Sequence, residues 1–173
     1  KDSDSCNIGE RYISDTYSPS KLLNQIHCTY HTAPYYKNTI SLITEIIDYK
    51  EKNLYRFLKH SLLSIMEYFH INTQITDSSS LNIDHSLKSE QKVLAIAKNL
   101  GAKNYYNPIG GIDLYSTDKF LAEGISLKFL QPSLTAYNQF SGKFIPGLSI
   151  VDVMMFNSKS DVIHQLNTSF TIH

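Results

Sequence analysis

The stretch from Tyr105 to Tyr115, YYNPIGGIDLY, constrains the fold of this chain more than any other. Pro108 lacks a backbone donor, and the paired Gly110 and Gly111 favour positive φ, so the stretch predicts a loop that no helix or strand continues through. Aromatic and polar side chains are unusually dense on both sides of these residues. We therefore expect the functional surface of the protein at this loop.

Apolar periodicity predicts the elements around the loop. The clearest stripe runs from Leu54 to Phe69 with i, i+3, i+4 spacing, and it predicts a helix that faces the core. Further helices are predicted at about residues 19–30, 38–48, 86–100, 118–123, 149–156 and 158–164, and short strands at 71–76, 103–106 and 125–129, with a strand or an edge at 7–13. We expect an α/β fold with a small, largely parallel sheet, flanking helices and a helix-rich first half, for which a Rossmann-like three-layer arrangement is one solution.

Composition limits the function classes. The chain has 16 basic and 16 acidic residues, which argues against nonspecific binding to nucleic acid or to an anionic membrane. Its 173 residues suit one domain, 1–173, and no apolar run reaches the roughly 18 residues of a membrane span. Cys6 and Cys28 suggest no disulfide framework, so we expect a reducing compartment, and no signal-peptide pattern opens the chain. Because the sequence opens on Lys1, we expect residues upstream to be missing.

Two polar loops are candidate ligand sites. The NPIGG segment follows a predicted strand and precedes a short helix, where backbone amides can cradle an anion, but a tight turn explains the glycines equally well. Ser78, Ser79 and Ser80 precede a helix that bears lysines, an arrangement suited to a phosphate or a sugar hydroxyl. An ordinary loop and a solvated helix face are the favoured interpretation of this second segment.

Metal binding and nucleophilic catalysis have little support in the sequence. His27 and His31 are spaced i, i+4 but lack a nearby carboxylate, so we predict no metal site. Cys28 is an unsupported nucleophile, because no residue in the sequence pattern would orient a general base toward its thiol. Asp113 and Asp152 could act as general bases only within a shared cleft.

Asp152 also has a simpler interpretation. Ser149 precedes it by three residues, the spacing of a capping box at the start of a helix that runs through Phe156. A capping role alone would account for this aspartate.

Several motifs resemble the WbqC-like protein family in order and spacing. They are LGAKNYYNPIGGIDLY, GISLKFLQ, YNQF and FIPGLSIVDVMMFNS, with NQIHCTYHTAPYY and TDSSSL upstream, and together they extend from about residue 13 to the end. Two departures stand out: Gln91, Lys92 and Val93 replace the family's Glu-Arg-Leu, and the family's opening Gln-Pro-Tyr motif is absent. The lysine cannot reproduce the bidentate grip of an arginine.

The resemblance implies a cytoplasmic bacterial protein of surface-polysaccharide (O-antigen) biosynthesis. Its expected activity is that of an acyl or aminoacyl transferase acting on a nucleotide-activated amino sugar without a cofactor. Under it, Asp152 is the general-base candidate, and the substrate-binding candidates are Ser78, Ser79, Tyr105, Asn107, Gly110, Gly111, Tyr115 and Gln139. A homo-oligomer or a polysaccharide-enzyme partner is compatible with it. The alternative is a non-catalytic binding or assembly module, which predicts an exposed aromatic patch at Tyr35, Tyr36 and Tyr137 instead of converging polar groups.

Overall fold

The computed structural model describes residues 6–140 and 142–173. They cluster into two compact units, each formed by two separate segments of the chain: Lys1–Asn72 with Thr135–Gln165 as unit 1, and Thr73–Leu134 with Leu166–His173 as unit 2. Each unit is described below by itself. The expectation of a single domain stays a prediction.

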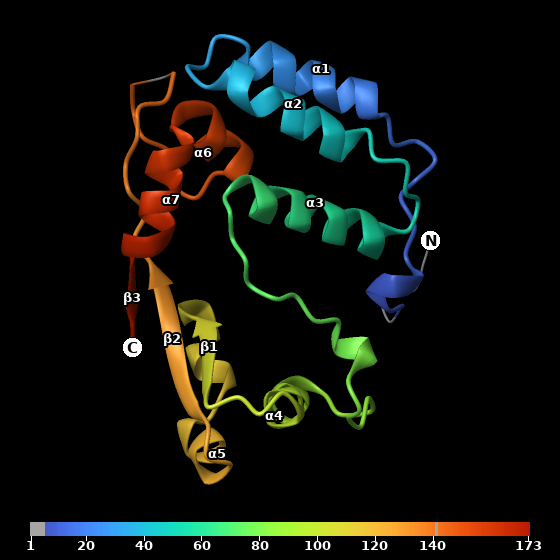
Figure 1. Cartoon of the computed structure of the whole chain (residues 1–173), viewed down its shortest axis with the longest axis vertical. Coiled ribbons are helices and arrows are strands. Elements are labelled where there is room, and N and C mark those ends of the chain that lie inside the picture. Colours follow the sequence, from blue (N-terminus) through green and yellow to red (C-terminus); the bar gives the residue numbers. More distant parts are fainter. Residues whose placement is uncertain (1–5, 141) are drawn as a thin grey trace. The chain divides into compact units, whose positions relative to one another are not determined.

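Unit 1 is helical. Its elements are the 3₁₀ turn η1 (Ile8–Glu10) and the helices α1 (Pro19–Tyr30), α2 (Tyr36–Ile47), α3 (Leu54–Tyr68), α6 (Ile150–Phe156) and most of α7 (Lys159–Thr168). Helix α2 contacts α1, α3 and α6 (Figure 1). Phe69, Met154 and Val162 form one buried cluster, so the core joins residues that lie far apart in the sequence.

Capping residues set the starts of the unit 1 helices. Ser18 accepts a hydrogen bond from the Lys21 backbone and Pro19 occupies the first turn of α1, which confirms the predicted helix start. Asn53 caps α3 by accepting from the Arg56 backbone at 3.1 Å. The strand or edge predicted at 7–13 is instead η1 followed by one isolated bridge at Tyr12.

The apolar stripe of α3 faces the core over part of its length only. Met66 and Phe69 are buried, whereas Leu58 and Leu62 are 44% and 49% exposed. After α3, His70 adopts positive φ and the Ile71 backbone donates to the Met66 carbonyl at 2.8 Å, a helix-terminating geometry. Residues 71–76 form no strand, so the strand predicted there was wrong. Their apolar and polar side chains alternate, but no other strand pairs with this segment among the described residues.

Unit 2 contains a three-stranded sheet of order β1-β2-β3. Its elements are η2 (Ser78–Ser80), α4 (Ser89–Asn99), β1 (Asn104–Pro108), η3 (Ile109–Leu114), α5 (Thr117–Ala122), β2 (Ser126–Pro132) and β3 (Phe170–Ile172). Strands β1 and β2 pair in parallel, and β3 pairs antiparallel to β2 (Figure 1). The fold is therefore mixed α and β, as expected, with a small mixed sheet. The parallel pair of strands was predicted from the sequence, and the antiparallel C-terminal strand was not.

The core of unit 2 lies between this sheet and its helices. Ala97 of α4, Phe120 of α5 and the inward side chains of β2 are buried together. Gly101 and Gly124 follow α4 and α5 at φ of +64° and +71°, the left-handed conformation in which glycine commonly ends a helix. Strand β1 ends at Pro108, and the turn η3, which contains Gly110 and Gly111, follows it directly.

Candidate functional site

A buried carboxylate in unit 1 collects three hydrogen bonds. Asp152, on α6, is only 5% exposed. Its Oδ1 accepts from the Tyr137 hydroxyl at 2.7 Å and from Gln139 Nε2 at 3.3 Å, and its Oδ2 accepts from the Tyr30 hydroxyl at 3.0 Å. These donors come from α1 and from the segment before α6, so a single carboxylate joins three parts of the chain.

Helix α6 is held in place at both ends. Ser149 caps its start by accepting from the Val151 backbone. At its other end, the Tyr35 backbone donates to the Met155 carbonyl at 3.0 Å, and the buried Thr39 hydroxyl donates to the Met154 carbonyl at 2.9 Å. Because free carbonyls at a helix end need partners, these bonds fix α6 against the start of α2.

The segment before α6 has no helix or strand among its described residues, 135–140 and 142–149, and we call it the aromatic loop. The Gln139 amide braces it: Oε1 accepts from the Ile145 backbone at 2.8 Å, and Nε2 donates to the Ile145 carbonyl at 3.2 Å. The Gly142 backbone also donates to the Gln139 carbonyl. Gln139 therefore shapes the loop and fastens it to Asp152 at the same time.

Aromatic rings pack beside this carboxylate. Phe156 lies 4.7 Å from Phe140, 6.2 Å from Tyr30 and 6.4 Å from Tyr137, measured between ring centres. Tyr137 also packs edge-on against Phe144 at 5.3 Å. Offset and edge-on pairs at these separations are favourable, so the rings hold both tyrosine hydroxyls toward Asp152.

Burial strengthens the preference of the two tyrosines for the neutral, donating form. It raises the pKa of Tyr30 to about 12, with the hydrogen bond to Asp152 contributing next. Burial also raises the pKa of Tyr137, again assisted by its bond to Asp152. Both phenols therefore remain protonated near neutral pH and act as donors to the carboxylate.

Among the described residues, three donors share the acceptor positions of the Asp152 carboxylate. An ionised carboxylate has about four acceptor positions. Three are taken by Tyr30, Tyr137 and Gln139. A hydroxyl or amine of a ligand that reached Asp152 would find an acceptor there, next to phenol oxygens that can also accept.

The structure corrects the local interpretation of Asp152. No capping box forms at α6: Ser149 caps the helix, but the Asp152 carboxylate bonds to residues 15 and 122 positions away. Sequence reasoning also missed Tyr30. The exposed aromatic patch that the assembly-module alternative predicts at Tyr35, Tyr36 and Tyr137 is not seen, because all three side chains are half-buried. One signal was present, because Tyr137 and Gln139 are spaced i, i+2 and share a side in extended chain.

A second group of predicted residues gathers in unit 2. The Tyr105 hydroxyl donates to Asn107 Oδ1 at 3.1 Å, and Asn107 Nδ2 donates to the Pro108 carbonyl at 3.0 Å. Tyr105 and Tyr115 pack edge-on at 6.0 Å, and both lie against the buried Phe120. Burial raises the pKa of Tyr105 to about 12, with Tyr115 contributing next.

The glycine pair is not the positive-φ loop that the sequence predicted. Residues Ile109–Leu114 form the 3₁₀ helix η3, and neither Gly110 nor Gly111 has positive φ. Gly111 is required for another reason, since a Cβ there would lie 2.0 Å from Asn107 Nδ2, whereas a Cβ on Gly110 would meet nothing within 4 Å. The close approach of Asn107, not backbone geometry, disfavours a side chain at position 111.

The sequence-predicted site residues are divided between the units. Gln139 and Asp152 belong to unit 1, and Ser78, Ser79, Tyr105, Asn107, Gly110, Gly111 and Tyr115 belong to unit 2. Ser78 and Ser79 are exposed in η2. Convergence of the two groups on one substrate stays a prediction.

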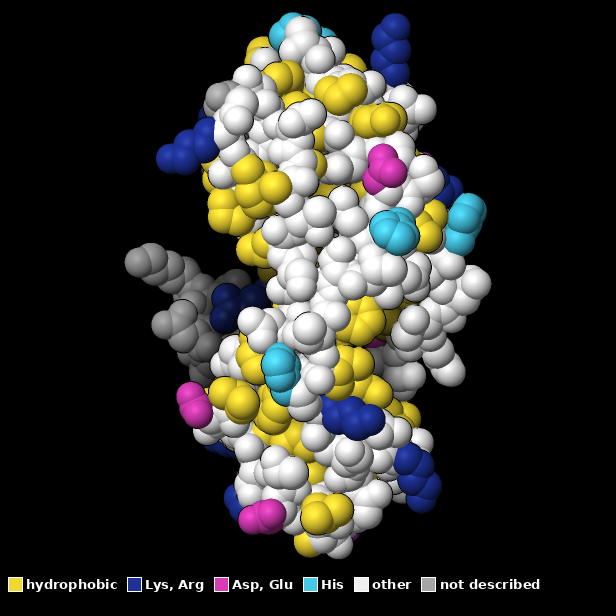
Figure 2. Space-filling view, turned by 90° about the vertical axis from the view of Figure 1, so that its left-hand side faces the viewer, with side chains coloured by type: hydrophobic (Ala, Val, Ile, Leu, Met, Phe, Trp, Pro, Cys, Tyr) yellow, Lys and Arg dark blue, Asp and Glu magenta, His cyan; other side chains and the backbone are white. Residues whose placement is uncertain are grey.

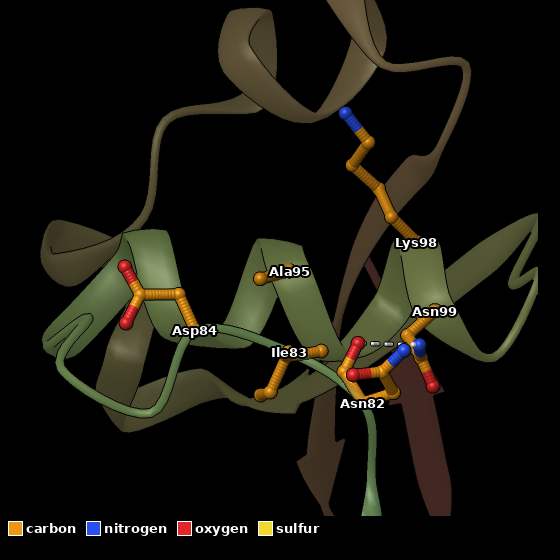
Figure 3. Close-up of a pocket in the computed structure, with 6 residues that line it drawn as sticks. All are labelled: Asn82, Ile83, Asp84, Ala95, Lys98 and Asn99. Carbon is orange, nitrogen blue, oxygen red and sulfur yellow. Dashed lines mark hydrogen bonds between the residues drawn. The ribbon is translucent and has the colours of Figure 1, made fainter.

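Unit 2 also has an open hollow of about 400 Å³ between residues 82–84 and α4 (Figure 3). Its polar groups already have partners within the unit. Asn99 Nδ2 donates to the Asn82 carbonyl, Asp84 accepts from Ser86, and Lys98 pairs with Glu123 at 2.5 Å. Figure 3 shows the Lys98 ammonium above α4 and the Asp84 carboxylate at the opposite side of the view, so these two charged groups do not converge on a ligand.

Charged side chains are scattered over the face drawn in Figure 2, where neither sign gathers into a patch among the described residues. Within residues 6–140 and 142–173, none of the helices has the length and apolar character of a membrane span. The same residues contain no cluster of three or more metal-ligating side chains.

Comparison with known proteins identifies one family. The model of the WbqC-like protein family matches residues 1–164, which include both the Asp152 group and the Asn107 group. This confirms the resemblance found in the sequence motifs. No curated protein and no solved structure matches the chain.

Proposed function

The chain belongs to the WbqC-like protein family, and from this premise we propose that it is an acyl or aminoacyl transferase for a nucleotide-activated amino sugar in bacterial surface-polysaccharide (O-antigen) biosynthesis. The observation that carries the proposal is the buried Asp152 with its three donors. An amino sugar offers amine and hydroxyl groups, which both donate and accept. The remaining acceptor position of Asp152 suits the amine, and the oxygens of Tyr30 and Tyr137 suit sugar hydroxyls.

In the proposed reaction, the amine nitrogen attacks the acyl carbon of the donor. A nitrogen–carbon bond forms, the bond from the acyl carbon to its leaving group breaks, the amine loses a proton and the leaving group gains one. Asp152 accepts the N–H of the amine and takes its proton, the general-base role. Tyr137 and Gln139 act as positioning residues, because they hold the carboxylate through its Oδ1.

Exposed apolar side chains of the aromatic loop would cover the apolar parts of the substrate. Phe140 is 54% exposed and Ile145 is 52% exposed, although both belong to a loop that is fastened to Asp152 through Gln139. Apolar groups beside a few fixed polar groups are the usual composition of small-molecule sites. This mixture favours a sugar nucleotide over a purely ionic ligand.

Ligand-dependent thermal stability tests the site. A nucleotide-activated amino sugar at 100 times its dissociation constant should stabilise the protein by about 2.7 kcal/mol. We expect Tyr137→Phe to lose much of this stabilisation, because it removes a donor to Asp152, and Tyr115→Phe in unit 2 to retain it. The opposite pattern would move the substrate site to the turn that contains Gly111.

A transfer assay tests the chemistry. With a labelled acyl or aminoacyl donor, Asp152→Asn should lower the rate of product formation by about 10²–10⁴-fold if Asp152 is the general base. Circular dichroism of the same variant serves as the folding control. If no amino-sugar nucleotide either stabilises the protein or accepts the acyl group, the proposal is refuted and the non-catalytic assembly module is favoured.

A further inference from the structure

Two histidines at the end of α1 lie side by side outside the Asp152 group. His27, in the last turn, and His31, the C-cap, are exposed and lie four positions apart, a spacing that places them on one face of the helix. Their ring centres are 5.3 Å apart and the rings are inclined by 37°. The proposed transferase chemistry uses neither side chain.

The protein holds one nitrogen of each ring. His31 Nδ1 bonds to the His27 carbonyl oxygen at 3.1 Å, and since a carbonyl only accepts, Nδ1 carries the proton. The neutral His31 ring therefore has its lone pair on Nε2. His27 Nδ1 bonds to the Tyr36 hydroxyl at 2.8 Å, which again leaves Nε2 outside the contact. Histidine metal ligands usually have their other nitrogen held in this way, because the bond fixes the tautomer and the ring orientation.

The spacing of the rings fits one tetrahedral ion. A metal–nitrogen bond of about 2.0 Å, with ~1.2 Å from nitrogen to ring centre, places each ring centre about 3.2 Å from the ion. Two centres 5.3 Å apart then subtend about 110° at the ion, close to the tetrahedral angle.

We propose that His27 and His31 bind one divalent transition-metal ion of the imidazole-preferring class, Zn²⁺, Ni²⁺ or Cu²⁺, through their Nε2 atoms, with water completing the coordination. The absence of a third protein ligand among the described residues makes this an open site rather than a closed structural one. The prediction of no metal site rested on the missing carboxylate, and a site completed by water does not need one. The inference is independent of the proposed transferase activity.

The ion would brace the last turn of α1. That turn carries Tyr30, whose hydroxyl donates to Asp152. A cation is also favourable at this position, because the C-terminal end of a helix bears partial negative charge.

Isothermal titration of the tag-free protein with Zn²⁺ and Ni²⁺ at neutral pH tests the proposal. We expect saturable binding of one ion per chain, weakened at least tenfold by His27→Gln and by His31→Gln. Tyr36→Phe keeps both ligands but removes the hydroxyl that holds His27 Nδ1, so it should weaken binding by roughly 10-fold, the lower end of outer-shell effects.

His85→Gln is the matched control, because His85 is an exposed histidine of unit 2 whose Nε2 bonds to the Leu81 carbonyl. Its affinity should equal that of the unmodified protein. The proposal is overturned if no ion binds saturably, if His27→Gln and His31→Gln bind as tightly as the unmodified protein, or if His85→Gln weakens binding equally. Circular dichroism of the histidine variants should be unchanged, which would show that weaker metal binding comes from the removed imidazole and not from unfolding.

Discussion

Replacing Gly111 by alanine tests whether the asparagine beside it dictates the glycine. The new Cβ would lie 2.0 Å from Asn107 Nδ2 and 3.2 Å from its Cγ, so the amide must move. In moving, Asn107 gives up its bond to the Pro108 carbonyl and the bond that it accepts from Tyr105. At about 1 kcal/mol for each hydrogen bond, the loss is about 2 kcal/mol.

A smaller term opposes this loss. Gly111 does not have positive φ, so alanine can adopt its backbone conformation. Under that condition a glycine-to-alanine change stabilises by about 0.4–1 kcal/mol, because it restricts the unfolded chain. We therefore expect Gly111→Ala to lower the free energy of unfolding by about 1 to 1.5 kcal/mol.

The sign should reverse when Asn107 is shortened first. In an Asn107→Ala background the nearest remaining group is Tyr115 Cε2 at 3.4 Å, an ordinary contact. There Gly111→Ala should stabilise by up to about 1 kcal/mol. Gly110→Ala, whose Cβ meets nothing within 4 Å, is the control and should be neutral or slightly stabilising.

Urea unfolding of the four members of this cycle, followed by circular dichroism, measures the coupling between positions 107 and 111. Equal destabilisation by Gly111→Ala in both backgrounds would refute the reasoning, because the clash would then lie elsewhere. A Gly110→Ala variant as unstable as Gly111→Ala would refute it too, since the backbone would then be the cause.

Two further predictions concern pH. The fold raises the pKa of Tyr30 from 10.0 to about 12, so it favours the neutral phenol, and that stability is complete below pH 10 and lost as the pH rises to 12. Tyr30→Phe should therefore flatten the alkaline fall in melting temperature, and an unchanged slope would count against the Tyr30–Asp152 bond. The hydrogen bond from Lys119 lowers the pKa of Glu90 below 4.5, so its contribution is present above that pH and lost below it. Glu90→Gln should be less stable than the unmodified protein at neutral pH, with the difference in urea midpoint shrinking in acid; a constant difference would exclude an ionic cause.

Features that depend on local pattern were predictable from the sequence. The helix starting at Pro19 and the strand predicted at 125–129 each follow from residues within a few positions of one another. The three-residue strand β3 was not predictable, because so short a segment has no periodicity and becomes a strand only by pairing with β2. The strand predicted from alternating side chains at 71–76 was wrong for the converse reason, because no other strand among the described residues pairs with it.

The candidate site illustrates the same limit. A capping box needs only Ser149 and Asp152, so sequence reasoning found the local explanation first. The actual partners of Asp152 include Tyr30, which lies 122 residues away, and no local pattern signals a bond of that range. The positive φ predicted for Gly111 was wrong, and the close approach of Asn107 to this glycine was not predictable, because the position of that side chain is visible only in three dimensions.

The interleaved order of the two units has a consequence for synthesis on the ribosome. Helices α1 to α3 emerge first, but the cluster around Phe69 also needs Met154 and Val162, which are made after the parallel strand pair. Unit 2 in turn receives its last strand from residues 170–172. The core of unit 1 therefore waits for residues 154–162 and the sheet of unit 2 for residues 170–172, and until these are translated the nascent polypeptide exposes unfinished cores to chaperones and proteases.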